Sequence, residues 1–238
     1  MQIIEVTGMG VRSAVIRLER RETPLRFILF PMIHLGRPEF YDAVRDRVSC
    51  CALVVAEGRD HTRPRVSLPG LAYRLLRRQR RSRLVVQRLR EETLGVPVVR
   101  PDLSLDEIRH RLRRLPTVTY LLARLTIRVV VPWVALYVLL FGAQRFLAGE
   151  LALDDDTPYI EPSLGKRWDD IDGVIVDDRD ALLLDALAKI HEARCGESID
   201  VAVVYGARHM PAVLHGLRKR YGYRARGADW LTVFDLDD

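Results

Sequence analysis

The sequence predicts an α/β fold: a mixed, largely parallel sheet flanked by helices, with a helical insertion in the middle of the chain. Short β-branched and aliphatic runs alternate with segments of helical periodicity at both ends of the chain. The middle third has helical spacing and many arginines instead. The chain has 238 residues, of which 48% are hydrophobic and 29% charged. It is therefore expected to form one domain over residues 1–238 with its own core, and residues 65–150 are the predicted insertion.

The N-terminal elements are predicted in the order strand, helix, strand. Residues 3–7, 11–18 and 25–33 are rich in the residue types that favour strands. Residues 37–48 have apolar side chains at helical spacing. Residues 51–56 are a continuous apolar run, typical of a strand that is covered on both faces. This order already favours an α/β core.

The middle of the chain is predicted to be helical. Helices are expected over residues 68–94 and 104–115, and the second opens with the capping-box pattern Ser104-Leu105-Asp106-Glu107. Residues 129–143 carry no charge, but a membrane-spanning helix needs about 20 such residues. We expect a buried helix of the insertion here. One alternative is peripheral membrane contact through residues 74–143, helped by the neighbouring arginines. Another is a homodimer that buries the apolar helix.

The last third returns to alternating strands and helices. Strands are predicted over residues 173–176, 201–205 and 230–236, and helices over residues 180–193 and 210–221.

Charge is distributed unevenly along the chain. Residues 61–128 hold 17 arginines and 5 acidic residues, whereas residues 149–200 hold 5 basic and 15 acidic residues; the whole chain carries +6. We expect these blocks to be solvated or to complement each other. A nucleic-acid partner is not expected, because no aromatic residues are interleaved with the arginines to stack on bases. Three cysteines cannot build a disulfide framework. We therefore expect a cytoplasmic protein, membrane-associated if the insertion contacts lipid.

Charged side chains follow the predicted strands at the point where each strand ends. His34 follows residues 25–33, and Glu57 and Arg59 follow residues 51–56. Arg179 follows residues 173–176, and His209 follows residues 201–205. Parallel strands bring such groups to one edge of the sheet, where open α/β sheets bind their ligands. The sequence therefore predicts a site at this edge.

The residue types indicate hydrolytic chemistry. Two imidazoles and a carboxylate can hold a divalent metal, which lowers the pKa of a bound water and polarises a carbonyl. Arginine keeps its proton and would act as a fixed positive charge. Without a metal, Glu57 and a histidine can do acid–base work on water. The structural alternative is that Glu57 and Arg59 form an ion pair with each other, and that Arg179 pairs with Asp178 or Asp180.

Four motifs resemble those of the TraB/PrgY/GumN family. Residues 31–34 (PMIH) and 53–59 (LVVAEGR) resemble that family's G-x-x-H and V-x-V-E motifs, the second followed by an arginine. Residues 178–180 (DRD) look like its E-R-D element, and residues 203–211 (VVYGARHMP) look like V-V-G-x-x-H-x-x-G. The family includes the TIKI peptidases and is similar to the ChaN and erythromycin-esterase folds. The resemblance covers roughly residues 25–60 and 170–236.

This resemblance implies an α/β fold with a variable helical insertion and a metal-dependent hydrolase site. On that basis His34, Glu57 and His209 are the expected ligands of Mn or a similar divalent ion. Glu57 and His209 are also the expected catalytic groups, supported by Arg59 and Arg179. The expected substrate is a small peptide, an ester or a related carbonyl compound.

Two departures from the motifs lead to an alternative function. Pro31 stands in place of the first motif's glycine and removes a backbone N–H. Ala212 or Val213 stands where the last motif has a glycine. The alternative is a non-catalytic protein that binds or sequesters small peptides at the cytoplasmic membrane face.

Overall fold

A computed structural model describes residues 1–58, 84–87, 94–114, 117, 133, 153–154 and 176–236. Within these residues eight strands form one sheet: β1 (Gln2–Val6), β2 (Gly10–Arg20), β3 (Thr23–Met32), β5 (Leu53–Ala56), β7 (Val98–Val99), β8 (Leu153–Asp154), β9 (Asp200–Gly206) and β10 (Arg224–Asp235). Their order is β7-β5-β9-β3-β2-β1-β8, and β10 also pairs with β2. Two further short strands, β4 (Leu35–Gly36) and β6 (Val85–Val86), pair with each other.

The centre of the sheet is parallel. β9 lies between β3 and β5 and runs parallel to both, and β5 is also parallel to β7. The pairs Met32↔Gly206 and Ala56↔Val204 show that the three central parallel strands β3, β5 and β9 end at nearly the same level. The outer strands β1, β2, β8 and β10 pair antiparallel. The sheet is therefore mixed with a parallel core, as predicted.

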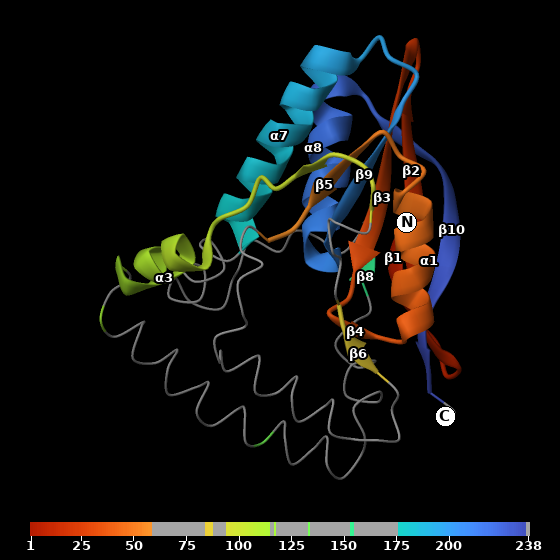
Figure 1. Cartoon of the computed structure of the whole chain (residues 1–238), viewed down its shortest axis with the longest axis vertical. Helices are drawn as coiled ribbons and strands as arrows, with labels where there is room; N and C mark the ends of the chain where they lie inside the picture. Colours follow the sequence, from red (N-terminus) through yellow and green to blue (C-terminus); the bar gives the residue numbers. More distant parts are fainter. Residues whose placement is uncertain are drawn as a thin grey trace.

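Helices cover both faces of the sheet. α7 (Asp178–Arg194) and α8 (Met210–Tyr221) lie side by side on one face, and α1 (Pro38–Val48) lies on the other, beside β10 (Figure 1). Ala14, Val15 and Ile16 are all buried although consecutive strand residues point to opposite faces. Their burial requires cover on both sides and explains the continuous apolar runs of the central strands.

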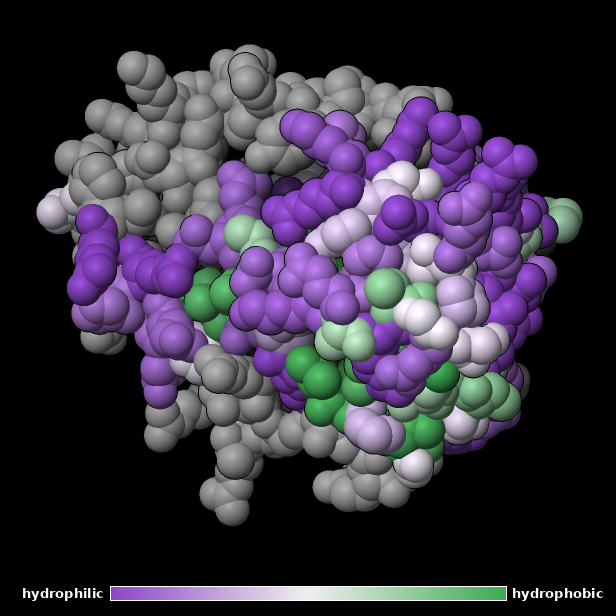
Figure 2. All heavy atoms as spheres, turned by 90° about the horizontal axis from the view of Figure 1, so that it is seen from above, coloured by the Kyte–Doolittle hydropathy of each residue, from purple (hydrophilic) through white to green (hydrophobic). Residues whose placement is uncertain are grey.

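The carboxyl ends of the central strands lie together at one end of the sheet. The carboxyl ends of β3, β5 and β9 lie at the same end of the molecule as the first turns of α7 and α8 (Figure 1). The opposite end, seen from above, is mostly hydrophilic, with hydrophobic side chains gathered in a limited area of that face (Figure 2). The carboxyl end is thus the edge at which the sequence predicts a site.

Most of the predicted elements at the two ends of the chain are confirmed. The strands over 3–7, 11–18, 25–33, 51–56 and 201–205 and the helices over 37–48, 180–193 and 210–221 correspond to observed elements within a few residues. The capping box is also confirmed at the start of α3 (Leu105–Arg114): Glu107 Oε2 accepts the N–H of Ser104 (2.7 Å) and Ser104 Oγ accepts the N–H of Glu107 (3.2 Å).

Three predicted elements need correction. β10 begins at Arg224, six residues before the predicted strand. Its first half is exposed and pairs with β2 through backbone hydrogen bonds, so it has no apolar pattern from which a strand could be predicted. Val176, the last residue of the predicted strand over 173–176, begins a π-helical turn that leads into α7; residues 173–175 lie outside the described residues. A helix through 68–94 is interrupted by β6, whose valines pair with β4.

Most of the predicted insertion lies outside the described residues, including residues 129–143 apart from Trp133, which is helical and exposed. The described part of 65–150 contains β7, which belongs to the main sheet, as well as α3. In the described part of the chain, no helix combines the length and hydropathy needed to cross a membrane.

Candidate functional site

The site is built around Glu57 at the carboxyl end of β5. Its backbone N–H donates to the carbonyl of Val204 (3.0 Å), so the residue continues the pairing of β5 with β9 before the chain turns away. Its side chain is 15% exposed, and both carboxylate oxygens are hydrogen-bonded. Arg179 Nη2 donates to Oε1 (2.6 Å), and the backbone N–H of Gly206 donates to Oε2 (2.7 Å). The carboxylate is therefore held between the ends of two strands and the start of α7.

Gly206 permits this arrangement because it has no side chain. A Cβ atom at this position would lie 3.1 Å from Glu57 Oε2 and 3.6 Å from Cδ2 of His209. A larger residue would press on the carboxylate that the Gly206 N–H binds, which is a reason for glycine at a point of close approach.

His209 lies beside Glu57, in the short turn (Ala207–His209) that joins β9 to α8. Its Nε2 atom is 4.0 Å from Glu57 Oε1, and its Nδ1 atom is 2.6 Å from Asp180 Oδ1 in the first turn of α7. The ring of Tyr205 packs edge-on against the imidazole, with the centroids 5.6 Å apart. His209 is 5% exposed, so Asp180 and Tyr205 together restrict how the ring can turn.

Arg179 joins Glu57 to a second carboxylate, Asp102. Its Nε and Nη2 atoms donate to the two oxygens of Asp102 (both 2.7 Å), the two-pronged geometry that a guanidinium forms with a carboxylate. The backbone N–H groups of Gly58 (2.7 Å) and Leu103 (2.8 Å) also donate to Asp102. Asp102 thus anchors Arg179, and Arg179 orients Glu57.

The mutual attraction of these charges shifts each pKa so that the charged form of the group is favoured. Burial by itself would raise the pKa of Glu57, but the charge and hydrogen bond of Arg179, with smaller effects of His34 and His209, leave it below the usual value. Burial would likewise raise the pKa of Asp102, and Arg179 with the two backbone N–H donors lowers it. Although burial opposes it, the two carboxylates raise the pKa of Arg179. Both carboxylates are therefore ionised at neutral pH.

The structure brings three of the predicted site residues together and places the others differently. Glu57, Arg179 and His209 lie together, as the parallel strand ends predict. His34 is exposed between β3 and β4, close enough to contribute to the lowered pKa of Glu57. Arg59 lies outside the described residues. Arg179 comes from the first turn of α7 and not from the end of a strand.

Two residues of the site, Asp102 and Asp180, were not predicted. Asp180 stands at the start of a helix, where an acidic residue is common whether or not it has a function. Asp102 follows β7, a strand of two residues that is too short to recognise from its sequence. The signal available was the same as for Glu57: a charged residue shortly after an apolar pair, here Val98-Val99.

The predicted ligands do not come together as a metal site among the described residues. Glu57 and His209 are adjacent, but Glu57 already accepts hydrogen bonds at both oxygens. Across the residues that the structure describes, no group of three or more His, Cys, Asp or Glu side chains is arranged to hold a metal ion. The described residues therefore do not assemble the three-ligand set that the family resemblance implies, and the divalent ion stays a prediction.

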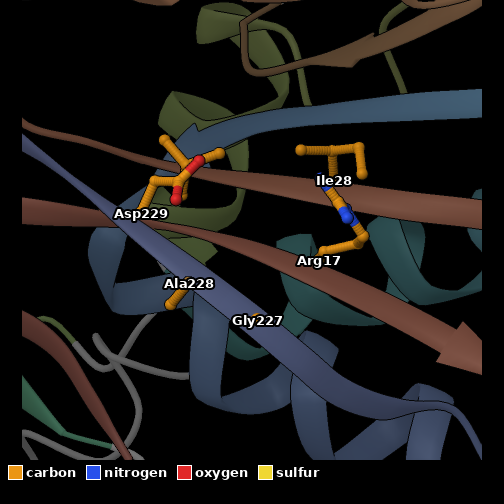
Figure 3. A pocket seen from close by; sticks show the side chains of 6 residues that line it. Arg17, Ile28, Gly227, Ala228 and Asp229 are labelled. Atoms are coloured by element: carbon orange, nitrogen blue, oxygen red, sulfur yellow. The ribbon is translucent and has the colours of Figure 1, made fainter.

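A hollow elsewhere on the molecule does not belong to this site. It has a volume of about 180 Å³ and lies over β2, β3 and β10, where Figure 3 shows Arg17, Ile28 and Asp229 around it. None of its lining residues belongs to the cluster around Glu57.

No family model, no curated protein and no solved structure matches this chain.

Proposed function

We propose that this chain is a hydrolase of peptide, ester or related carbonyl substrates, in which Glu57 and His209 act on a water molecule. The observation that supports the proposal most directly is the distance of 4.0 Å between His209 Nε2 and Glu57 Oε1. A titratable imidazole and an ionised carboxylate are thereby directed at the same small volume, at the edge of a parallel sheet where α/β proteins bind ligands.

The proposed reaction is general acid–base hydrolysis. The oxygen of water forms a bond to the carbonyl carbon, and Nε2 of His209 takes one of its protons. The bond from that carbon to the leaving nitrogen or oxygen then breaks, and Nε2 returns the proton to the leaving group. Glu57 accepts a hydrogen bond from the second O–H of the water, which stays on the oxygen, and so orients the water; its negative charge favours the imidazolium that forms. Arg179 keeps Glu57 ionised and in place.

A divalent ion predicted from the family resemblance would supply Lewis-acid chemistry if bound. His34, Glu57 and His209 are the ligands that the resemblance implies for it, although the described residues do not form a three-ligand group. The acid–base roles above do not depend on it.

The proposal is tested with the purified chain on nitrophenyl esters and on a fluorogenic peptide library. Glu57→Gln and His209→Gln should each lower turnover by at least about 100-fold, since a positioned acid or base contributes about that much. His215→Ala is the matched control, because His215 is exposed on α8; it should turn over like the unmodified chain. Circular dichroism and the melting temperature check that all three variants fold.

Unchanged turnover in both Gln variants would remove the proposed mechanism. Saturable peptide binding without any turnover would support the alternative, a peptide-binding protein. Elemental analysis of the same preparations, with His34→Ala/His209→Ala as the comparison, tests the predicted metal.

A further inference from the structure

The contact between Asp180 and His209 determines which imidazole nitrogen carries a proton. An ionised carboxylate only accepts hydrogen bonds. The distance of 2.6 Å between Asp180 Oδ1 and His209 Nδ1 therefore requires a proton on Nδ1. A neutral imidazole has one N–H, so Nε2 then presents a lone pair toward Glu57.

Glu57 Oε1 is also an acceptor, so two acceptors face each other. Their separation of 4.0 Å is too long for a direct hydrogen bond in any protonation state of His209. Among the described residues no hydrogen bond to Nε2 is formed, and Oε1 accepts only from Arg179. A carboxylate oxygen can accept a second bond in addition.

A water molecule has the two donors that this pair of acceptors needs. Two hydrogen bonds of about 2.8 Å reach atoms 4.0 Å apart when they diverge by roughly 90°, close to the angle between the two O–H bonds of water. Arg179 holds Glu57 Oε1 by a hydrogen bond, and the ring of Tyr205 packs against the imidazole of His209.

We propose that Asp180 is a positioning residue that fixes the Nδ1–H tautomer of His209, and that His209 Nε2 and Glu57 Oε1 together bind one water molecule. The inference deepens the proposed function, because this water is the nucleophile of the hydrolysis. Asp180 acts only through His209. The network that carries the site thus runs from Asp180 through His209 and the water to Glu57, and from there through Arg179 to Asp102.

The test needs no substrate, so its failure is separate from failure of the proposed function. The full chain is labelled with ¹⁵N-histidine, and long-range ¹H–¹⁵N spectra are recorded at about pH 8, where an ordinary imidazole is neutral. The signals of His209 are assigned by their loss in His209→Gln. We expect the Nδ1–H tautomer in the unmodified chain.

Asp180→Asn should shift His209 toward the Nε2–H tautomer, because the amide can donate to Nδ1. Asp185→Asn is the matched control: Asp185 is exposed on the same helix, and its substitution should leave the spectrum unchanged. Asp180→Glu should retain the tautomer. If the proposed function holds, Asp180→Asn should also lower kcat by at least about tenfold while KM changes little, because the residue does not touch the substrate.

The water is detected by magnetisation transfer from water to the two carbon-bound ring protons of His209 that flank Nε2, and this transfer should weaken in Glu57→Gln. An Nε2–H tautomer in the unmodified chain, or an Asp180→Asn spectrum like that of the unmodified chain, would overturn the assignment of Asp180. Stoichiometric metal in the NMR sample would overturn the assignment of the water, because a cation would then join the two acceptors.

Discussion

Arg179 is the residue on which the geometry of the site depends. It is 13% exposed at its side chain and lies between Glu57 and Asp102, whose side chains are 15% and 2% exposed. Removing the guanidinium would leave two buried carboxylates close together without the positive charge that they share. Breaking a buried pair in this way costs far more than the pair itself contributes, because an uncompensated charge stays behind.

We therefore expect Arg179→Met to lower the free energy of unfolding by about 3–5 kcal/mol at pH 7. The matched control is Arg111→Met, since Arg111 forms an ion pair with the neighbouring Asp178 in which both side chains are about two-fifths exposed. Its loss should cost less than about 1 kcal/mol. Urea unfolding of both variants measures the difference, and equal losses would show that Arg179 contributes no more than a surface pair.

The residues of the site were predictable to different degrees. Glu57 and His209 follow apolar runs long enough to be recognised as strands, and parallel pairing brings such positions together wherever they stand in the sequence. Arg179 follows an apolar run that is predicted to be a strand, and the structure places it in the first turn of α7. Asp102 and Asp180 were missed because a carboxylate that binds a distant side chain has no periodicity of its own.

At the scale of elements, the turn between β1 and β2 shows how two similar glycines can differ in role. Gly10 pairs with Asp235 of β10, and a Cβ atom on Gly10 would lie 2.5 Å from the carbonyl oxygen of Phe234. Gly8, two residues earlier, would meet nothing within 4 Å. The backbone of β10 passes directly over Gly10, so this glycine allows β2 and β10 to pair to their ends.

Gly10→Ala is expected to destabilise the chain by about 1–3 kcal/mol, because the clash is with backbone that can move only if the strands separate. Gly8→Ala should change the stability by no more than about 0.5 kcal/mol. Thermal unfolding followed by circular dichroism compares the two. A similar shift in both variants would mean that the turn itself, and not the approach of β10, determines the effect.

Element boundaries were predictable where side-chain patterns reflect burial. The central strands are buried on both faces, and α1, α7 and α8 bury one face each. The first half of β10, the two-residue strands and the turn before α7 do not, because backbone hydrogen bonds form there whatever side chains are present.

At the scale of the whole molecule, the ionised site ties separate parts of the fold together. Glu57 and Gly206 end two central strands, Arg179 begins α7, and Asp102 follows β7. These bonds require ionised carboxylates. The pKa values of Glu57 and Asp102 lie below their ordinary values of 4.5 and 3.8, because Arg179 outweighs the effect of burial. The site therefore links stability to acid pH.

The lowered pKa values determine whether the free energy of unfolding rises or falls with pH. A carboxyl whose pKa is lower in the folded state contributes stability that is fully present above its unfolded pKa. That contribution is lost as the pH falls through the folded pKa. The contribution of Glu57 and Asp102 to the free energy of unfolding should thus be constant above about pH 5. Below about pH 4.5 it should decrease, by on the order of 1–3 kcal/mol for the two groups together.

Urea unfolding at a series of pH values measures how steeply the free energy of unfolding changes with pH. Asp102→Asn should make the decrease below about pH 4.5 shallower, since one of the two titrating groups is gone. Asp42→Asn, an exposed carboxyl paired with Arg45 on α1, is the control and should leave the slope nearly unchanged. A slope in Asp102→Asn equal to that of the unmodified chain would contradict the linkage.

The sequence by itself determined the order of strands and helices at both ends of the chain and the charged residues that follow the strands, because burial of alternating or continuous apolar runs is a local property of the chain. Only the tertiary structure decided which of those charged groups bind one another. Asp102 stands 77 residues before Arg179, and Asp180 stands 29 residues before His209, yet each pair lies within hydrogen-bond distance. Such distances depend on how whole strands and helices pack, and no short segment of sequence encodes them.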